Sequence, residues 1–350
     1  MKTDRGGARA PLVELILTRL REFVREPEAL FWAFVFPVLM SLALAVAFPN
    51  RTQPTFVAIT EGPRQADVRR VLQGVPDLQL RDVPATPAGE ARALREGEVH
   101  LIVEPTMPPA YRLDTARQEG RVARLIVDAA LKRAEGRIEP WQAREIAVQV
   151  PGSRYVDWLL PGIVAMNIMG TGMWGLGFSI VSARMKNLLK RLVASPMRRS
   201  DYLVAQLAAR MVFLAPEVIV PFAFGAIALG MPINGSVGSI AVVSIIGALT
   251  FASVGLLVAT RARTFEAISG ILNMAMLPMW ILSGVFFSAS NFPDPVQPLV
   301  QALPLTALID ALRGVVLDGA SLTAVSGELA ILAAWAVFPF ALAMSIFRWR

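Results

Sequence analysis

RMKNLLKRLVASPMRRSDY, residues 184–202, is a basic segment that separates two long apolar runs. The run before it, 158–183, contains no charged residue, and the run that starts at Leu203 contains only Arg210 and Glu217. An uncharged run of about twenty residues is long enough for a helix to cross the hydrocarbon of a bilayer. The basic segment therefore joins two membrane spans. Because it is longer than a connecting turn needs to be, we expect another molecule to contact it.

The composition predicts a polytopic membrane protein. Of the 350 residues, 55% are hydrophobic, which exceeds the value of about 45–50% for a soluble domain. Cysteine is absent, so neither disulfides nor thiolate chemistry is expected. We expect an all-α polytopic membrane protein with a small inserted α/β domain. Its six predicted transmembrane helices are 29–48, 158–183, 203–230, 236–260, 267–290 and 329–347.

The distribution of basic residues predicts the orientation. Sixteen of the 34 lysines and arginines lie in four short segments, 1–28, 184–200, 261–263 and 348–350. Short loops that are rich in lysine and arginine stay in the cytoplasm. Both termini are therefore expected in the cytoplasm, and residues 49–155 outside it. This topology accounts for the net charge of +7, so nucleic acid is not an expected partner.

Two regions flank the predicted first span, 29–48. Residues 1–28 read as a cytoplasmic tail with an interfacial helix at 11–26, which would contact membrane lipids. About 28 residues of mixed charge precede the span, so we expect an anchor and not a cleaved signal sequence. Residues 49–155 read as an extracytoplasmic α/β domain. In it we expect strands and helices to alternate at 55–60, 65–73, 78–83, 87–96, 100–105 and 120–135.

Local signals refine this inserted domain. Thr86 is expected to cap the helix at 87–96, and Gly97 to end it. The helix at 120–135 is amphipathic, and its apolar face is expected to contain Val122, Leu125, Ile126 and Ala129.

The region 156–350 contains the second to sixth predicted spans. Between the fifth and the sixth span, residues 291–318 are too polar and too rich in proline to cross the membrane. They predict a re-entrant hairpin at the outer surface, with short helices at 296–303 and 305–317. Asp310 and Arg313 are three residues apart and are expected to pair on one helix face.

Motifs for chemistry within this chain are absent. The sequence contains no G-x-x-x-x-G-K-[ST], no H-E-x-x-H and no G-x-S-x-G. His100 is the only histidine, and we interpret it as structural because no cluster of metal ligands accompanies it. We therefore predict no catalytic residue, no metal site and no cofactor in this chain.

A few polar and flexible side chains within the spans are candidates for a translocation path. A charge at mid-span costs about 2.5–3.5 kcal/mol on insertion scales, so Glu217 is a functional candidate. Arg210 is expected nearer the cytoplasm, where its side chain can reach the lipid headgroups. Hydrogen bonding between helices and ordinary packing are the alternatives for the remaining candidates. The candidates are Asn167, Met173, Glu217, Asn273 and Met276.

Residues 188–206, LLKRLVASPMRRSDYLVAQ, resemble the cytoplasmic coupling region of type-2 ATP-binding-cassette exporter permeases. Three further stretches are similar to that family in order and spacing: LLPGIVAMNIM (159–169), ILSGVFFS (281–288) and ALPLTALIDALRGVVLDG (302–319). A large extracytoplasmic domain between the first two spans is typical of one branch. The chain has Asn187-Leu188 where the family often has Gly-Thr, and Lys190 at an often acidic position.

The resemblance implies a permease subunit of an ATP-driven exporter in the bacterial plasma (inner) membrane. Two permease copies, or two related halves, would form the path and dock separate ATPase subunits that bind ATP and Mg²⁺. The uncharged spans favour an amphipathic or apolar cargo such as a drug or a lipid. The residues expected to couple to the ATPase are Lys186, Asn187, Leu188, Leu189, Lys190, Arg191, Leu192, Ser195, Pro196, Arg198 and Arg199.

Two other functions are compatible with six spans. An ion-coupled carrier or channel would need its own coupling charges, and Arg210 and Glu217 are few for that role. A membrane-anchored sensor or scaffold would use the domain at 49–155 to bind a ligand. Dependence on an ATPase partner distinguishes the exporter from both.

Overall fold

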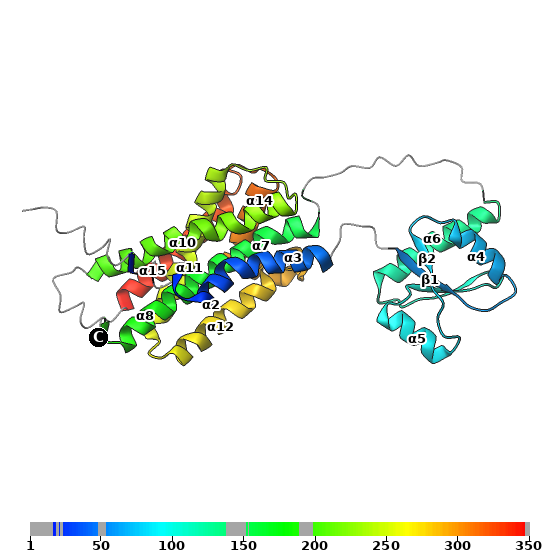
Figure 1. Cartoon of the computed structure of the whole chain (residues 1–350), viewed down its shortest axis with the longest axis horizontal. Coiled ribbons are helices and arrows are strands. Elements are labelled where there is room, and N and C mark those ends of the chain that lie inside the picture. Colours follow the sequence, from blue (N-terminus) through cyan, green and yellow to red (C-terminus); the bar gives the residue numbers. More distant parts are fainter. Residues whose placement is uncertain are drawn as a thin grey trace, which may run out of the picture. The chain divides into compact units, whose positions relative to one another are not determined.

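A computed structural model describes residues 17–18, 21, 24–47, 54–137, 152, 154–188 and 199–346. The chain forms two compact units (Figure 1). The first, Met1–Pro49 with Gln149–Arg350, is a helical bundle, and the second, Asn50–Val148, is an α/β domain. The predicted fold class, a polytopic helical protein with a small inserted α/β domain, is confirmed. The expected interfacial helix at 11–26 lies mostly outside the described residues.

Within the described ranges, five helices are long and apolar enough to cross a membrane. The first of them is continuous over Tyr155–Met185 and consists of α7 (Tyr155–Gly170), η2 (Thr171–Gly175) and α8 (Leu176–Met185). The segment η2 is a π-helical turn. The other four are α10 (Arg199–Ala228), α11 (Val237–Arg261), α12 (Phe265–Leu282) and α15 (Ser326–Ile346).

The predicted first span is also helical. It consists of α2 (Pro27–Leu30), the π-helical turn η1 (Phe31–Val35) and α3 (Phe36–Ala47). Its apolar part, Phe31–Ala47, is shorter than the five spanning helices.

The predicted span at 267–290 is too long, because α12 ends at Leu282. Two residues later, Gly284 has φ = 76°, in the left-handed region that glycine adopts without steric cost and that ends helices. The uncharged run continues through this turn, so the absence of charge did not mark the end of the helix.

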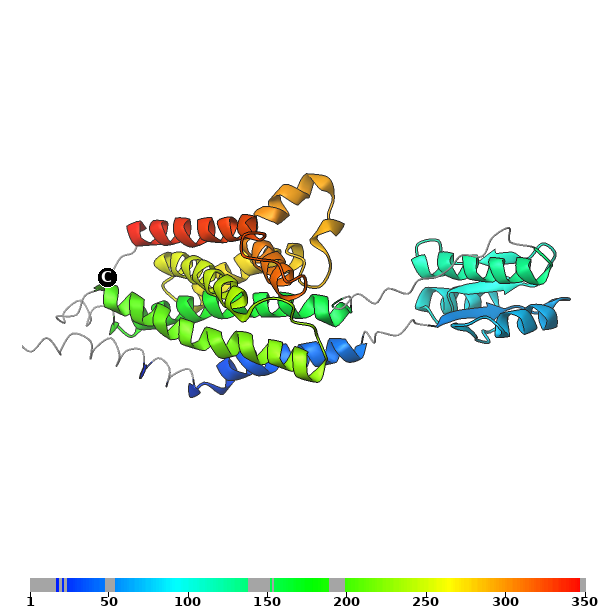
Figure 2. The same cartoon turned by 90° about the horizontal axis from the view of Figure 1, so that it is seen from above.

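The predicted two-helix hairpin is present as α13 (Gln297–Ala302) and α14 (Pro304–Val316), with a bend of 83° between Asp294–Ala302 and Pro304–Val316 (Figure 2). No ion pair joins Asp310 to Arg313 among the described residues, although each charge acts on the other. Arg313 instead donates from Nε to the Trp158 carbonyl at 3.0 Å and from Nη2 to the Gly284 carbonyl at 2.8 Å. Its guanidinium also lies 3.6 Å from the centre of the Trp158 ring. Arg313 thus ties the hairpin to α7 and to the turn after α12.

Helix α11 is the most enclosed of the five spanning helices, and it packs against α7, α10, α14 and α15. Its contact with η2 depends on small residues. A Cβ atom on Gly255 would lie 2.8 Å from the Met173 carbonyl oxygen, and one on Gly172 would lie 3.0 Å from Cβ of Phe251. Glycine allows the two backbones to approach this closely.

The inserted domain contains a four-stranded sheet with the order β2-β1-β3-β4. Strands β1 (Thr55–Ile59), β2 (Leu78–Leu80) and β3 (Leu101–Glu104) are parallel, and β4 (Ala110–Arg112), which we did not predict, is antiparallel to β3. Helices α4 (Gln65–Gln73) and α6 (Gln118–Ala134) cover one face and α5 (Pro87–Glu96) the other (Figure 1).

The local signals around α5 are confirmed. The Thr86 hydroxyl accepts a hydrogen bond from the Gly89 amide at 3.1 Å, and Gly97 ends the helix with φ = 76°. The predicted buried face of α6 is wrong, because Val122 is 44% exposed and Leu125 62%. The helix instead buries Gly120, Ala123, Val127 and Leu131.

Candidate functional site

A cavity of about 930 Å³ lies between helices of the bundle and is partly open, since Trp32 and Phe286 in its lining are exposed. Its wall is formed by the first helix (α2, η1 and α3), by α7, η2 and α8, by α10 and by α12. Three polar residues also line the cavity. Glu26 immediately precedes α2, Ser182 lies near the end of α8, and Gln206 lies in the first part of α10.

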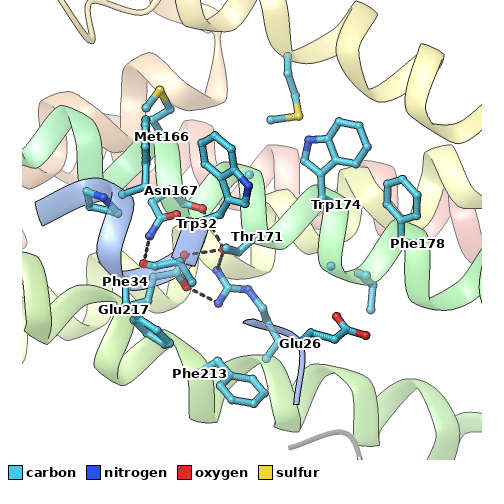
Figure 3. Close-up of a pocket in the computed structure, with 18 of the residues that line it drawn as sticks. Glu26, Trp32, Phe34, Met166, Asn167, Thr171, Trp174, Phe178, Phe213 and Glu217 are labelled. Atoms are coloured by element: carbon cyan, nitrogen blue, oxygen red, sulfur yellow. Dashed lines mark hydrogen bonds and ion pairs between the residues drawn. The ribbon is translucent and has the colours of Figure 1, made fainter. Parts of the chain in front are cut away.

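Aromatic side chains make up much of the cavity wall. Trp32 and Phe34 come from η1, Trp174 from η2, Phe178 from α8 and Phe213 from α10 (Figure 3). The rings of Trp174 and Phe178 stack with centroids 5.0 Å apart and an interplanar angle of 16°. The wall thus offers large apolar surfaces, which is typical of sites for small organic molecules.

A polar network lies within this aromatic wall. Nη1 of Arg210 donates to Oε2 of Glu217 at 2.5 Å, and Nη2 donates to the Thr171 hydroxyl at 2.7 Å. Oγ1 of Thr171 is 2.5 Å from Oε1 of Glu217 and donates to it. Figure 3 shows Thr171 and Glu217 grouped beside Asn167. Both oxygens of the carboxylate are therefore engaged.

The network is buried, since Arg210 is 9% and Glu217 1% exposed. Arg210 and Glu217 are seven residues apart on α10, which is close to two helical turns, so they share a face. Thr171, the first residue of η2, lies between them on the neighbouring helix. The expectation that Arg210 reaches the lipid headgroups is wrong, because its guanidinium turns inward to Glu217.

Asn167 connects the second predicted span to the first. Its Nδ2 donates to the Ala33 carbonyl at 2.7 Å. Four residues after Ala33, Pro37 has no N–H with which to close the usual helical hydrogen bond. The Asn167 amide supplies a donor to that carbonyl and so ties α7 to the first helix.

The other predicted path residues fall into two groups. Met276 lines the cavity with Asn167 and Glu217. Met173 is fully buried beside Gly255 and is not part of the cavity wall, and Asn273 is on an exposed face of α12.

The predicted coupling residues are only partly described. Lys186, Asn187 and Leu188 are exposed at the end of α8, and Asn187 has φ = 56°. The backbone of Arg199 begins α10. The remaining coupling residues, Leu189, Lys190, Arg191, Leu192, Ser195, Pro196 and Arg198, lie outside the described residues.

Thr171, Trp174 and Phe178 were not predicted from the sequence, although a signal for them was present. They follow the predicted Asn167 at intervals of four, three and four residues, which is the spacing of one helical face. Glu26 had no such signal, because it stands alone at the start of α2.

Residues 112–317, more than half of the chain, match the family model described as ABC-2 type transporter. The chain belongs to this family. Its matched region contains four of the five spanning helices and the hairpin. Thus the ABC-2 type transporter family and the helical bundle agree that this is a multi-pass membrane permease.

Individual relatives cover different shares of the chain. Nodulation protein J of Bradyrhizobium diazoefficiens is 29% identical over 212 residues, which are 59% of this chain and 78% of that relative. The probable multidrug ABC transporter permease YbhS of Escherichia coli K12 is 25% identical over 172 residues, 48% of this chain and 45% of the relative. The inner membrane transport permease YadH of the same strain is 23% identical over 165 residues, which are 46% of this chain and 63% of that relative.

Proposed function

We propose that this ABC-2 permease is the membrane-spanning subunit of an ATP-driven exporter. Two permease copies, or two related halves, form the translocation path, and separate ATPase subunits bind ATP and Mg²⁺. The chain is a transport subunit and not an enzyme. It resides in the bacterial plasma (inner) membrane, with both termini in the cytoplasm and the inserted domain outside.

The observation that carries this proposal is the aromatic cavity within the bundle. A cavity of about 930 Å³ is at the upper end of the range for small-molecule sites. Within it Arg210 and Glu217 compensate each other's charge, and most of the described lining is apolar, so the wall favours a cargo with a large apolar body. An amphipathic or apolar organic molecule is therefore the proposed cargo class.

Energy is proposed to enter the chain through residues 184–202. These residues join α8 to α10, and both helices contribute to the cavity wall. A displacement of this segment by an ATPase subunit would therefore act on two walls of the cavity at once. The leucines of the segment are expected to provide its apolar docking face.

The experiment is reconstitution of the chain with its cognate ATPase in vesicles. We expect ATP-dependent export and cargo-stimulated ATP hydrolysis. The variant Leu189→Asp/Leu192→Asp should insert normally but lose stimulated hydrolysis and transport. Leu125→Asp is the matched control, because Leu125 is 62% exposed on the inserted domain.

Two results would contradict the proposal. Full coupling in the double variant would exclude the segment 184–202 as the docking element. Transport that follows an ion gradient without any ATPase would favour the ion-coupled carrier instead.

A further inference from the structure

The charges around the cavity are not balanced. Among the described residues that line it, three carry a formal charge: Glu26, Arg210 and Glu217. Arg210 and Glu217 neutralise each other at 2.5 Å. Glu26 therefore leaves the cavity with one uncompensated negative charge.

The compensated pair has little left to offer a ligand. Both oxygens of Glu217 already accept hydrogen bonds, from Thr171 and Arg210. Both terminal nitrogens of Arg210 already donate, and only its buried Nε–H has no hydrogen-bond partner among the described residues. A bound molecule would therefore meet this part of the wall as a neutral surface.

Glu26 is in a different situation. It is exposed at the N-terminal end of α2, and its side chain makes no capping hydrogen bond. Among the described residues, no cation forms an ion pair with it. The neighbouring Arg25 is exposed and does not line the cavity. The carboxylate is thus available to a ligand, and Figure 3 shows it apart from the group formed by Asn167, Thr171 and Glu217.

The aromatic wall favours the same sign of charge. The face of a tryptophan or phenylalanine ring carries negative potential, which attracts cations and repels anions. Trp32 and Trp174 line the cavity, whereas the ring of Phe178 is stacked against both Trp174 and Phe265. The Glu26 carboxylate and the aromatic rings therefore both favour a cationic ligand over an anionic one.

We propose that the cavity binds amphipathic organic cations, with Glu26 holding the cationic group and the aromatic wall holding the apolar body. The polar lining residues Glu26, Ser182 and Gln206 suit the head of such a molecule, and the aromatic lining suits its apolar tail. This assignment rests on the exporter function proposed above and specifies its cargo class.

The test uses two ions of matched shape and opposite charge, tetraphenylphosphonium and tetraphenylborate. Their binding to the purified full chain in nanodiscs is measured by equilibrium dialysis, with empty nanodiscs as the blank. We expect the cation to bind more tightly than the anion. Glu26→Gln should lower the affinity for the cation by about fivefold to tenfold, the effect of one partly screened charge. It should not lower the affinity for the anion.

Two further variants locate the site. Glu28→Gln is the matched control, because Glu28 is exposed in the first turn of the same helix and does not line the cavity. It should change neither affinity. Phe178→Ala removes apolar surface from the wall and should lower the affinity for both ions. Thermal unfolding of each variant shows whether the bundle is intact.

Several outcomes would overturn the assignment. Equal effects of Glu26→Gln on both ions, or equal effects of Glu26→Gln and Glu28→Gln on the cation, would remove Glu26 from the site. Loss of cation binding only in nanodiscs that contain phosphatidylethanolamine would assign Glu26 to a lipid ammonium and not to cargo.

The binding assay needs no ATPase, so the two proposals fail separately. Unchanged binding of the cation to Glu26→Gln, with ATP-driven transport intact, contradicts only the cation site. Charge-selective binding without ATP-driven transport contradicts only the exporter.

Discussion

Glu217 and Arg210 are tolerated inside the bundle because their opposite charges are paired. A lone charge at the centre of a membrane helix costs about 2.5–3.5 kcal/mol on insertion scales. Here the carboxylate receives the guanidinium and the Thr171 hydroxyl, and the guanidinium also reaches the Ile168 carbonyl at 3.3 Å. The pair therefore behaves as one neutral unit that holds α10 against α7 and η2.

Removing only one member of this pair should be worse than removing both. We expect Arg210→Met to lower the free energy of unfolding by about 3–5 kcal/mol, because it leaves the Glu217 charge buried without a partner. Arg210→Met/Glu217→Gln should recover a large part of that loss. Denaturant unfolding in micelles measures both variants. Arg263→Met, at an exposed arginine, controls for the substitution itself, and a double variant no more stable than Arg210→Met would refute this account.

At the scale of single residues, the sequence indicated the importance of Glu217 but not its partner. Each charge was interpreted alone, although a separation of seven residues places Arg210 on the same helix face as Glu217. The residues from neighbouring helices could not be predicted in this way. Thr171 reaches the pair, and Asn167 reaches Ala33, only because α7 packs beside α10 and the first helix.

At the scale of elements, glycine sets how closely α11 approaches η2. Gly255→Ala would place a methyl group 2.8 Å from the Met173 carbonyl oxygen, and a rigid backbone cannot yield as a side chain can. We expect a loss of about 1–3 kcal/mol, as for other overpacked sites. Gly270→Ala on α12 is the matched control, because a Cβ there meets nothing within 4 Å, and alanine favours helix.

Unfolding of the two glycine variants in micelles provides the comparison. Equal stability of Gly255→Ala and Gly270→Ala would show that the close approach of α11 and η2 contributes nothing to the bundle.

The sequence predicted most elements but not all of their ends and faces. Uncharged runs located the spans, yet α12 stops at Leu282 because Gly284 turns the chain. The three-residue strand β4 is too short for an alternating pattern to reveal it. On α6, the buried face contains the small residues Gly120 and Ala123 beside Val127 and Leu131, and a Cβ on Gly120 would lie 3.0 Å from the His100 carbonyl oxygen.

At the scale of the whole molecule, two units with different physical requirements share one chain. The bundle exposes apolar side chains such as Met274 and Ile227, which suit lipid. The inserted domain buries apolar residues on both faces of its sheet and carries ion pairs on its surface. This change in composition is why the division could be predicted from the sequence, and it implies that residues 50–148 can fold on their own.

The excised domain, residues 50–148, should fold and should lose stability in alkali because of Tyr111. Burial, and then the nearby Asp128 carboxylate, raise the pKa of Tyr111 from 10.0 to about 12. The phenol donates to Asp128 Oδ1 at 3.2 Å, so the folded state holds a proton that the unfolded state releases above pH 10. The Tyr111 contribution is therefore fully present below pH 10 and is lost as the pH rises from 10 to 12.

Thermal unfolding of the excised domain followed by circular dichroism between pH 8 and 12 measures this contribution. Tyr111→Phe keeps the ring and the pair between Lys132 and Asp128 but has no phenol to titrate. Its midpoint should fall less steeply between pH 10 and 12 than that of the unaltered domain, since only the remaining groups titrate there. Parallel curves would mean that the phenol is as easily ionised in the folded domain as in the unfolded chain. An excised domain without a cooperative transition would instead show that residues 50–148 depend on the bundle to fold.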